Sequence, residues 1–284
     1  MADTMLTFTN DTLSRPLSNE EIMKTCPHAF KTDPTNPGVS NRYVQATTID
    51  VVNDMRKLGW YPVAAKQCRP KKGSKGIRSF HMLAFQNPEV RLMTGDEIEA
   101  YPRIILTNSH DGFNSFKFMV GLYRLVCSNG LIICDEEFAN ISIKHINYTF
   151  ETLRETVKAA IESVPSKVRI INAMKSTVLT EDEKKEFAAK AIKIRKKVSD
   201  DEKLSISRET IEEILNPKRK EDEGNDLWNV YNVVQERLMK GEFSYSEENS
   251  NKSRKQRKIN SVTKDLALNT ALFSLAKNYM TVSA

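Results

Sequence analysis

Apolar side chains recur at every third or fourth position in several stretches of the chain, which is the spacing of one buried helix face. One stretch covers residues 47–58 and is followed by Gly59, a residue suited to a left-handed helix cap. A longer one runs from Phe150 to Met174, and Pro165 inside it is expected to kink or split that helix. Further helices are predicted over 181–198 after a Thr180–Glu183 capping box, over 211–215, over 227–238 and over 262–279.

Between the first helix and Phe150, short runs rich in β-branched and aromatic residues are bounded by turn-forming residues, a pattern typical of strands. These runs cover residues 60–65, 77–86, 101–107, 113–123, 125–134 and 141–146. A helix, a mainly antiparallel β-sheet and a long helix therefore form a core, which is followed by a helical C-terminal half. This order defines an α+β fold.

Prolines and polar residues divide the chain further. Residues 1–39 are expected to be an N-terminal arm that carries one short helix after Ser18 and docks through Phe30. Residues 40–178 are the expected α+β core domain. Residues 179–284 are the expected helical region, with a mobile basic linker near 242–261.

The composition favours an acidic partner, because the chain of 284 residues has a net charge of +6 and a pI of about 9.0. Nucleic acid is the first candidate. No apolar run of ~18 residues predicts a membrane span, and the N-terminus has no pattern of a secretory signal. The four cysteines form no CxxC pair, so we expect reduced thiols and a location in the cytoplasm of a bacterial host cell. No Gly-rich phosphate loop is present, and no nucleotide cofactor is expected.

Basic residues gather at two places. The first is a predicted hairpin tip with six cations within thirteen residues and no acid among them: Lys66, Arg69, Lys71, Lys72, Lys75 and Arg78. Such a tip can grip phosphates, and the alternative is a solvated loop that protects a sheet edge. Lys117 and Arg124 on a neighbouring strand are expected to contribute to the same surface. The second place, Lys252 to Lys258, is interpreted either as an arm that binds nucleic acid or as a plain charged linker.

Polar residues also gather between the predicted central strands, in Asn108, Ser109, His110, Asp111 and Gly112, with Cys127 and Asn129 after the next strand. Three interpretations remain open for this motif. The first is a turn, since Asn, Asp and Gly tolerate a positive φ. The second is a binding site for a phosphate or a base edge. The third is a metal or catalytic site near His110 and Asp111, to which His81 and His145 would contribute side chains. No metal-ligand spacing supports the third interpretation, so no metal is assigned.

A family resemblance covers almost the whole chain, from about Ser40 to Tyr279. Its landmarks are Arg42–Tyr43, Gly59–Trp60, His81–Met82, Asn108–Gly112, Arg124–Leu131, Asp226–Glu236 and Leu268–Asn269. On these residues the chain resembles a family of phage- and plasmid-like proteins with a domain of unknown function, number nine hundred and thirty-two. That resemblance implies a mobile-element protein and brings no established activity.

The element order adds a second, architectural resemblance. A helix that ends in Gly59–Trp60, then antiparallel strands, then a long helix is similar to the core of single-strand annealing recombination proteins of the Rad-fifty-two type. Those proteins form rings and hold single-stranded DNA in a basic groove. Fold similarity alone does not establish function.

The leading hypothesis is a non-enzymatic phage or plasmid protein that binds single-stranded DNA in recombination or replication and assembles into a homo-oligomer through its helical half. One alternative is a protein-interaction factor that counters host defence or regulates replication. A second alternative is a metal-dependent enzyme with its site near His110 and Asp111.

Overall fold

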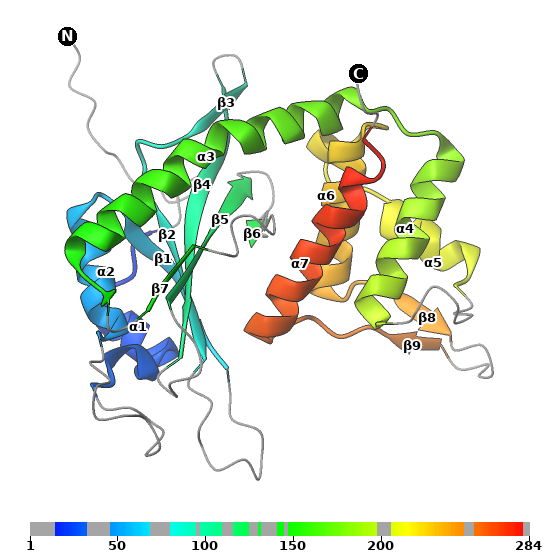
Figure 1. Ribbon diagram of the computed structural model, residues 1–284. Coiled ribbons are helices and arrows are strands. Elements are labelled where there is room, and N and C mark those ends of the chain that lie inside the picture. The colour runs from blue at the N-terminus through cyan, green and yellow to red at the C-terminus, as the bar shows by residue number, and fades with distance from the viewer. Residues whose placement is uncertain are drawn as a thin grey trace. The chain divides into compact units, whose positions relative to one another are not determined.

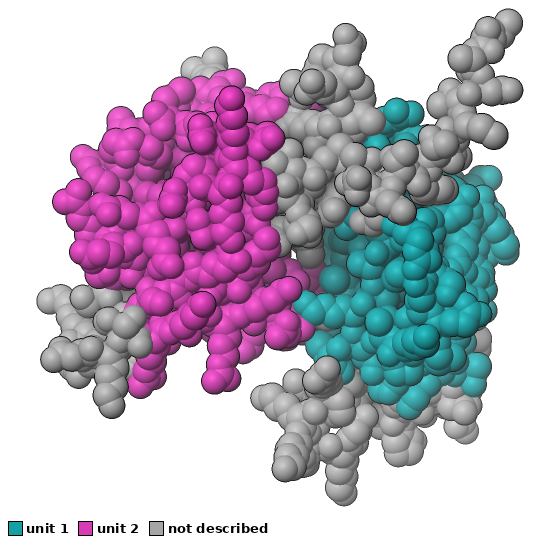
Figure 2. Space-filling model, turned by 180° about the vertical axis from the view of Figure 1, so that it is seen from behind, with its two compact units in different colours: residues 1–164 teal, residues 165–284 magenta. Residues whose placement is uncertain are grey.

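The computed structural model describes residues 15–32, 46–68, 80–94, 97–109, 116–124, 130–131, 141–144, 147–197, 206–246 and 253–280. Contacts along the chain divide it into two compact units, residues 1–164 and 165–284 (Figure 2). The domain boundary after residue 178 that the sequence indicates stays a prediction. No helix of the described residues is long and apolar enough to cross a membrane.

The first unit is built on an antiparallel sheet with the strand order β1-β2-β4-β5-β6, in which β3 also pairs with β4 and β7 with β5 (Figure 1). The strands are β1 (Tyr61–Gln67), β2 (His81–Gln86), β3 (Leu92–Thr94), β4 (Glu97–Asn108), β5 (Phe116–Arg124), β6 (Gly130–Leu131) and β7 (Ile141–Ile143). Two helices precede the sheet, α1 (Asn19–Thr25) and α2 (Thr48–Lys57), with a 3₁₀ turn, η1 (Pro27–Phe30), between them. The α+β fold class is thereby confirmed.

Helix α2 forms where the apolar spacing predicted it. Thr47 and Asp50 form a capping box at its start, and Val51 and Met55 are fully buried. The helix ends at Lys57, and the chain leaves it through Gly59, whose φ of +79° lies in the left-handed region.

The N-terminal segment packs on β1. The backbone N–H of Leu17 donates to the carbonyl of Pro62 at 2.7 Å, and that of His28 donates to Gln67 Oε1 at 3.0 Å. Ile22 in α1 is fully buried. The described part of the expected arm is therefore docked.

Helix α3 (Phe150–Ser176) runs through Pro165 without interruption, so the expected split does not occur (Figure 1). Apolar positions on both sides of the proline stay in phase, and Pro165 itself is exposed. The backbone bond that proline removes therefore lies on the solvent side of the helix.

The second unit packs helices around α6 (Leu227–Lys240). Its other elements are α4 (Glu181–Lys196), α5 (Arg208–Leu215), η3 (Lys220–Asp222), α7 (Val262–Lys277) and the hairpin of β8 (Ser244–Ser246) and β9 (Ser253–Lys255). Tyr231 of α6 is fully buried, and its ring centroid lies 6.5 Å from that of Phe187 and 6.3 Å from that of Phe273. These three rings join α4, α6 and α7 into one core.

Candidate functional site

A buried polar cluster lies at the end of β4, where the motif Asn108–Gly112 begins. The pairing of β2 with β4 places His81 opposite Asn108, and both side chains are fully buried. The hydroxyl of Thr48, the first residue of α2, lies 2.8 Å from His81 Nε2 and accepts a hydrogen bond of 2.9 Å from Asn108 Nδ2. These bonds fix the start of α2 to two central strands.

One acceptor of this cluster remains open. Asn108 Oδ1 is buried and has no hydrogen-bond partner, and Ser109 beside it is also fully buried. A buried acceptor left without a donor costs about 1–3 kcal/mol, so such groups are rare away from ligand sites. Among the described residues, no group of three His, Cys, Asp or Glu side chains is arranged to hold a metal ion.

Most of the motif that the sequence singled out lies outside the described residues. This applies to His110, Asp111, Gly112, Cys127 and Asn129, and to His145 of the metal hypothesis. All three interpretations of the motif therefore remain predictions.

The predicted nucleic-acid residues are only partly described. Arg69, Lys71, Lys72, Lys75 and Arg78 of the hairpin tip lie outside the described residues, and Arg124 is the last residue of β5.

Two cations of this set share one row of the sheet. Lys66 pairs with Met82, Met82 with Thr107, and Thr107 with Lys117. Residues paired across strands point to the same face, so Lys66 and Lys117 share a face at a separation of about 14 Å. Lys117 is exposed there.

A basic groove lies in the second unit, with a volume of about 740 Å³. It is formed by the C-terminal end of α4, the β8–β9 hairpin, the segment after β9 and the start of α7. Of the described residues that line it, seven are Lys or Arg and none is Asp or Glu: Arg195, Lys196, Arg254, Lys255, Arg257, Lys258 and Lys264. Tyr245 adds an aromatic ring, and Lys196 Nζ lies 3.4 Å from its centroid.

The backbone of the groove is held by specific contacts. Arg195 donates from Nε to the carbonyl of Leu238 at 3.2 Å and from Nη2 to the carbonyl of Arg257 at 2.9 Å. Burial lowers the pKa of the Arg195 guanidinium from its usual value.

Two further features seat the segment after β9. Gly241 ends α6 with a φ of +70°, and a Cβ there would lie 2.4 Å from the backbone carbon of Arg257. The N–H of Ile259 donates to the carbonyl of Met239 at 3.0 Å, and Ile259 is buried. Part of the segment that we expected to be a mobile linker is thus folded onto α6.

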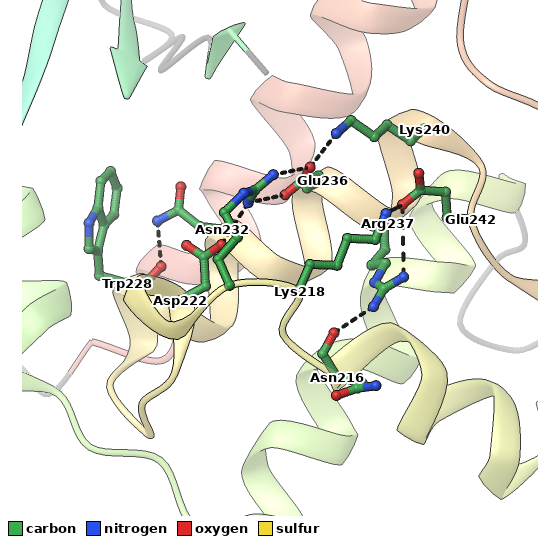
Figure 3. Close-up of polar contacts among 10 residues, drawn as sticks. Asn216, Lys218, Asp222, Trp228, Asn232, Glu236, Arg237, Lys240 and Glu242 are labelled. Carbon is green, nitrogen blue, oxygen red and sulfur yellow. Dashed lines mark hydrogen bonds and ion pairs between the residues drawn. The ribbon is translucent and has the colours of Figure 1, made fainter. Parts of the chain in front are cut away.

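An ion-pair network surrounds Glu236 of α6, the last residue of the landmark Asp226–Glu236 (Figure 3). Arg219 donates to both carboxylate oxygens of Glu236, at 2.8 and 2.7 Å, and to Asp222 at 2.7 Å. Lys240 also bonds Glu236. Burial alone would raise the pKa of Glu236, but the bonds from Arg219 and Lys240 outweigh it and lower that pKa to about 2.

The rest of this landmark also serves packing. Asp226 caps α6, Trp228 stacks against Tyr231 with ring centroids 6.4 Å apart, and Gln235 bonds Asn269 at 2.8 Å. The last contact links the landmark to Leu268–Asn269. Asn232 donates to the carbonyl of Trp228 at 2.6 Å.

The fold and the groove define an α+β protein with a basic groove on its helical unit. The chain belongs to the family described as Domain of unknown function (DUF932), whose model matches residues 38–272. It is 31% identical over 270 residues to UPF0380 protein YafZ of Escherichia coli (strain K12), covering 94% of this chain and 93% of that protein. It is 30% identical to UPF0380 protein YfjQ of the same strain, with the same coverage. No solved structure matches the chain. The family resemblance inferred from the sequence is confirmed.

Proposed function

We propose that this protein binds nucleic acid, with single-stranded DNA as the favoured ligand, and that it serves recombination or replication of a phage or plasmid without catalysing a reaction. One observation carries the proposal: among the described residues that line the groove of the second unit, seven are cationic and none is a carboxylate. A sugar–phosphate backbone offers a row of negative charges that matches this lining. An aromatic ring beside the cations is typical of grooves that track single strands.

The charge of the groove sets a measurable salt dependence. Each phosphate neutralised on a single strand contributes about −0.7 to the slope of log affinity against log salt concentration. If all seven cations contact phosphates, the slope is about −5. Affinity then falls about a thousandfold between about 50 mM and about 200 mM salt.

The sheet unit supplies the second part of the proposed binding surface. Lys66 and Lys117 share a row of the sheet, and the hairpin tip from Lys66 to Arg78 is proposed to add phosphate contacts. Assembly into a homo-oligomer through the helical half is part of the same proposal. Static light scattering of the full chain tests it, and a monomer mass at all concentrations would contradict it.

Fluorescence anisotropy of labelled single and double strands of about 20 nucleotides, titrated across a salt series, tests the central claim. The double variant Lys255→Glu and Lys258→Glu reverses two exposed cations of the groove. Its matched control is Lys158→Glu with Lys220→Glu, which changes the net charge equally at exposed positions that do not line the groove.

We expect the groove variant to bind single strands at least about tenfold more weakly than the control and to show a shallower salt slope. Equal weakening in both variants would show that net charge alone acts, and would remove the groove from the proposal. No binding by the wild-type protein at low salt would refute nucleic-acid binding and favour a protein partner instead. The variant Lys71→Glu, Lys72→Glu and Lys75→Glu tests the hairpin tip in the same assay.

A further inference from the structure

The basic groove continues into a second hollow of different chemistry, with a volume of about 630 Å³. Its wall is made by the last turn of α4 and one side of α7. Five apolar residues line it: Ile194, Ile259, Ala267, Leu268 and Ala271. Ile259 and Leu268, each 5% exposed, form its bottom, whereas Ala267 is exposed at its mouth.

The two hollows share a wall. Arg195, Lys196, Gln256, Ile259 and Lys264 line both of them. Among the described residues, no Asp or Glu lines the second hollow either, and its five apolar side chains lie beside four cations, Arg195, Lys196, Lys197 and Lys264. A ligand that fills both hollows and also covers these apolar side chains is therefore an anion with a flat or apolar part attached to it.

We infer that the apolar hollow receives an unpaired base whose phosphate lies among the cations of the adjoining basic groove. The inference rests on the proposed function and names the part of the strand that is recognised. A base in a duplex is stacked on both faces and paired with its partner, so placing it in the hollow costs a few kcal/mol of unstacking and unpairing that an unpaired strand does not require. Burial of the base against the apolar lining adds affinity that is independent of salt.

Fixed groups at the shared wall support this arrangement. With its amide oxygen turned toward two donors, Gln256 accepts hydrogen bonds from Arg195 Nη2 at 3.1 Å and from the backbone N–H of Arg257 at 3.2 Å. Arg195 is held in addition by its bond to the Leu238 carbonyl. The wall between the base position and the phosphate position is thus built from side chains that are already in place, which lowers the entropy cost of binding.

The test compares two labelled oligonucleotides of equal length and charge, one of thymidines and one of abasic residues, on the wild-type full chain. We expect the thymidine strand to bind at least about fivefold more tightly, the lower end of the contribution of one stacked base.

The variant Ala267→Leu with Ala271→Leu fills the hollow without changing charge, and leucine is a good helix former with no aromatic face for stacking. The control Ala159→Leu with Ala189→Leu makes the same change on α3 and α4, away from both hollows.

In the filled variant we expect the advantage of thymidine over abasic strands to vanish, while binding of the abasic strand and its salt slope stay at wild-type values. That second readout also shows that the variant is folded. Equal binding of the two strands by the wild-type protein overturns the inference and leaves the proposed function standing. If the filled variant still prefers the thymidine strand to the abasic strand as strongly as the wild-type protein does, the base does not bind in this hollow. If the wild-type protein binds neither strand, the proposed function itself is wrong.

Discussion

The ion-pair network of α6 allows a prediction of stability against pH. Glu236 has a side chain that is only 6% exposed and bonds two cations, Arg219 and Lys240. Its pKa falls from an ordinary 4.5 to about 2, which at about 1.4 kcal/mol per unit corresponds to roughly 3 kcal/mol. Breaking a buried pair by removing one partner typically costs about 3–5 kcal/mol, which agrees in size.

The sign follows from the lowered pKa. A carboxylate with a depressed folded-state pKa stabilises the protein at any pH above its unfolded value, and this contribution is lost as the pH falls from about 4.5 toward 2. We therefore expect Glu236→Gln to lower the free energy of unfolding by about 3 kcal/mol at neutral pH. The difference from wild type should shrink by about 2 kcal/mol between about pH 5 and about pH 3.

Urea unfolding followed by tryptophan fluorescence is a suitable assay, because the chain has two tryptophans and one lies in each unit. In a Trp60→Phe background, Trp228 in α6 reports the unit that carries Glu236. The control is Glu212→Gln on α5 of the same unit, which removes an ion pair with Arg208 whose side chains are 56% and 79% exposed and is expected to change stability by less than about 0.5 kcal/mol. Two results would refute the reasoning. In the first, Glu236→Gln lowers the free energy of unfolding by no more than the control does. In the second, it lowers that free energy by the same amount at about pH 5 and at about pH 3.

Three further predictions follow from single contacts. Thr48→Ala removes the hydroxyl shared by the buried polar cluster and should cost about 1–3 kcal/mol in urea unfolding, whereas Ser142→Ala at an exposed position of β7 should cost almost nothing. Gly241→Ala should destabilise the second unit by more than about 1 kcal/mol and weaken oligonucleotide binding, because Gly241 has a positive φ and an added Cβ would meet the backbone of Arg257. Unchanged binding of the oligonucleotide in fluorescence anisotropy would contradict the role given to this glycine. Burial raises the pKa of the Cys26 thiol to about 12, so in a variant whose other cysteines are serine we expect no reaction with a thiol reagent at about pH 8 until urea unfolds the protein.

Local signals predicted the elements, because periodicity and caps act within a few residues. The apolar spacing and Gly241 placed α6 within two residues of its ends, and the capping box at Thr180 opened α4. The sequence did not reveal β3, β8 and β9, because each has three residues and lies in no longer alternating run, unlike β7, which lies in the predicted run 141–146. The continuity of α3 at Pro165 depends on which side of the helix the proline faces, and that side is fixed by packing.

The buried cluster shows what sequence reasoning can find of a site. The density of polar residues between apolar strands pointed to Asn108, but His81 and Thr48 come from 27 and 60 positions away in the chain. Their meeting is set by strand register and by the docking of α2. Neither of these follows from the spacing of residues along the chain.

The sequence found the basic groove only in part. Arg254, Lys255, Arg257 and Lys258 belong to the run from Lys252 to Lys258 that it interpreted as a nucleic-acid-binding arm or a charged linker, whereas Arg195 and Lys196 at the end of α4 were missed. Residues 181–203 carry eight Lys or Arg and seven Asp or Glu, so their summed charge shows almost no cationic excess. On α4 the charges are separated along the axis: Glu181, Asp182 and Glu183 lie in the first turn, and Lys193, Arg195 and Lys196 in the last. A helix of 16 residues is about 24 Å long, which exceeds the screening length of about 8 Å at physiological salt. The acidic end therefore cannot neutralise the groove at the basic end, and charge counted by helix turn, rather than summed over the segment, is the signal that finds it.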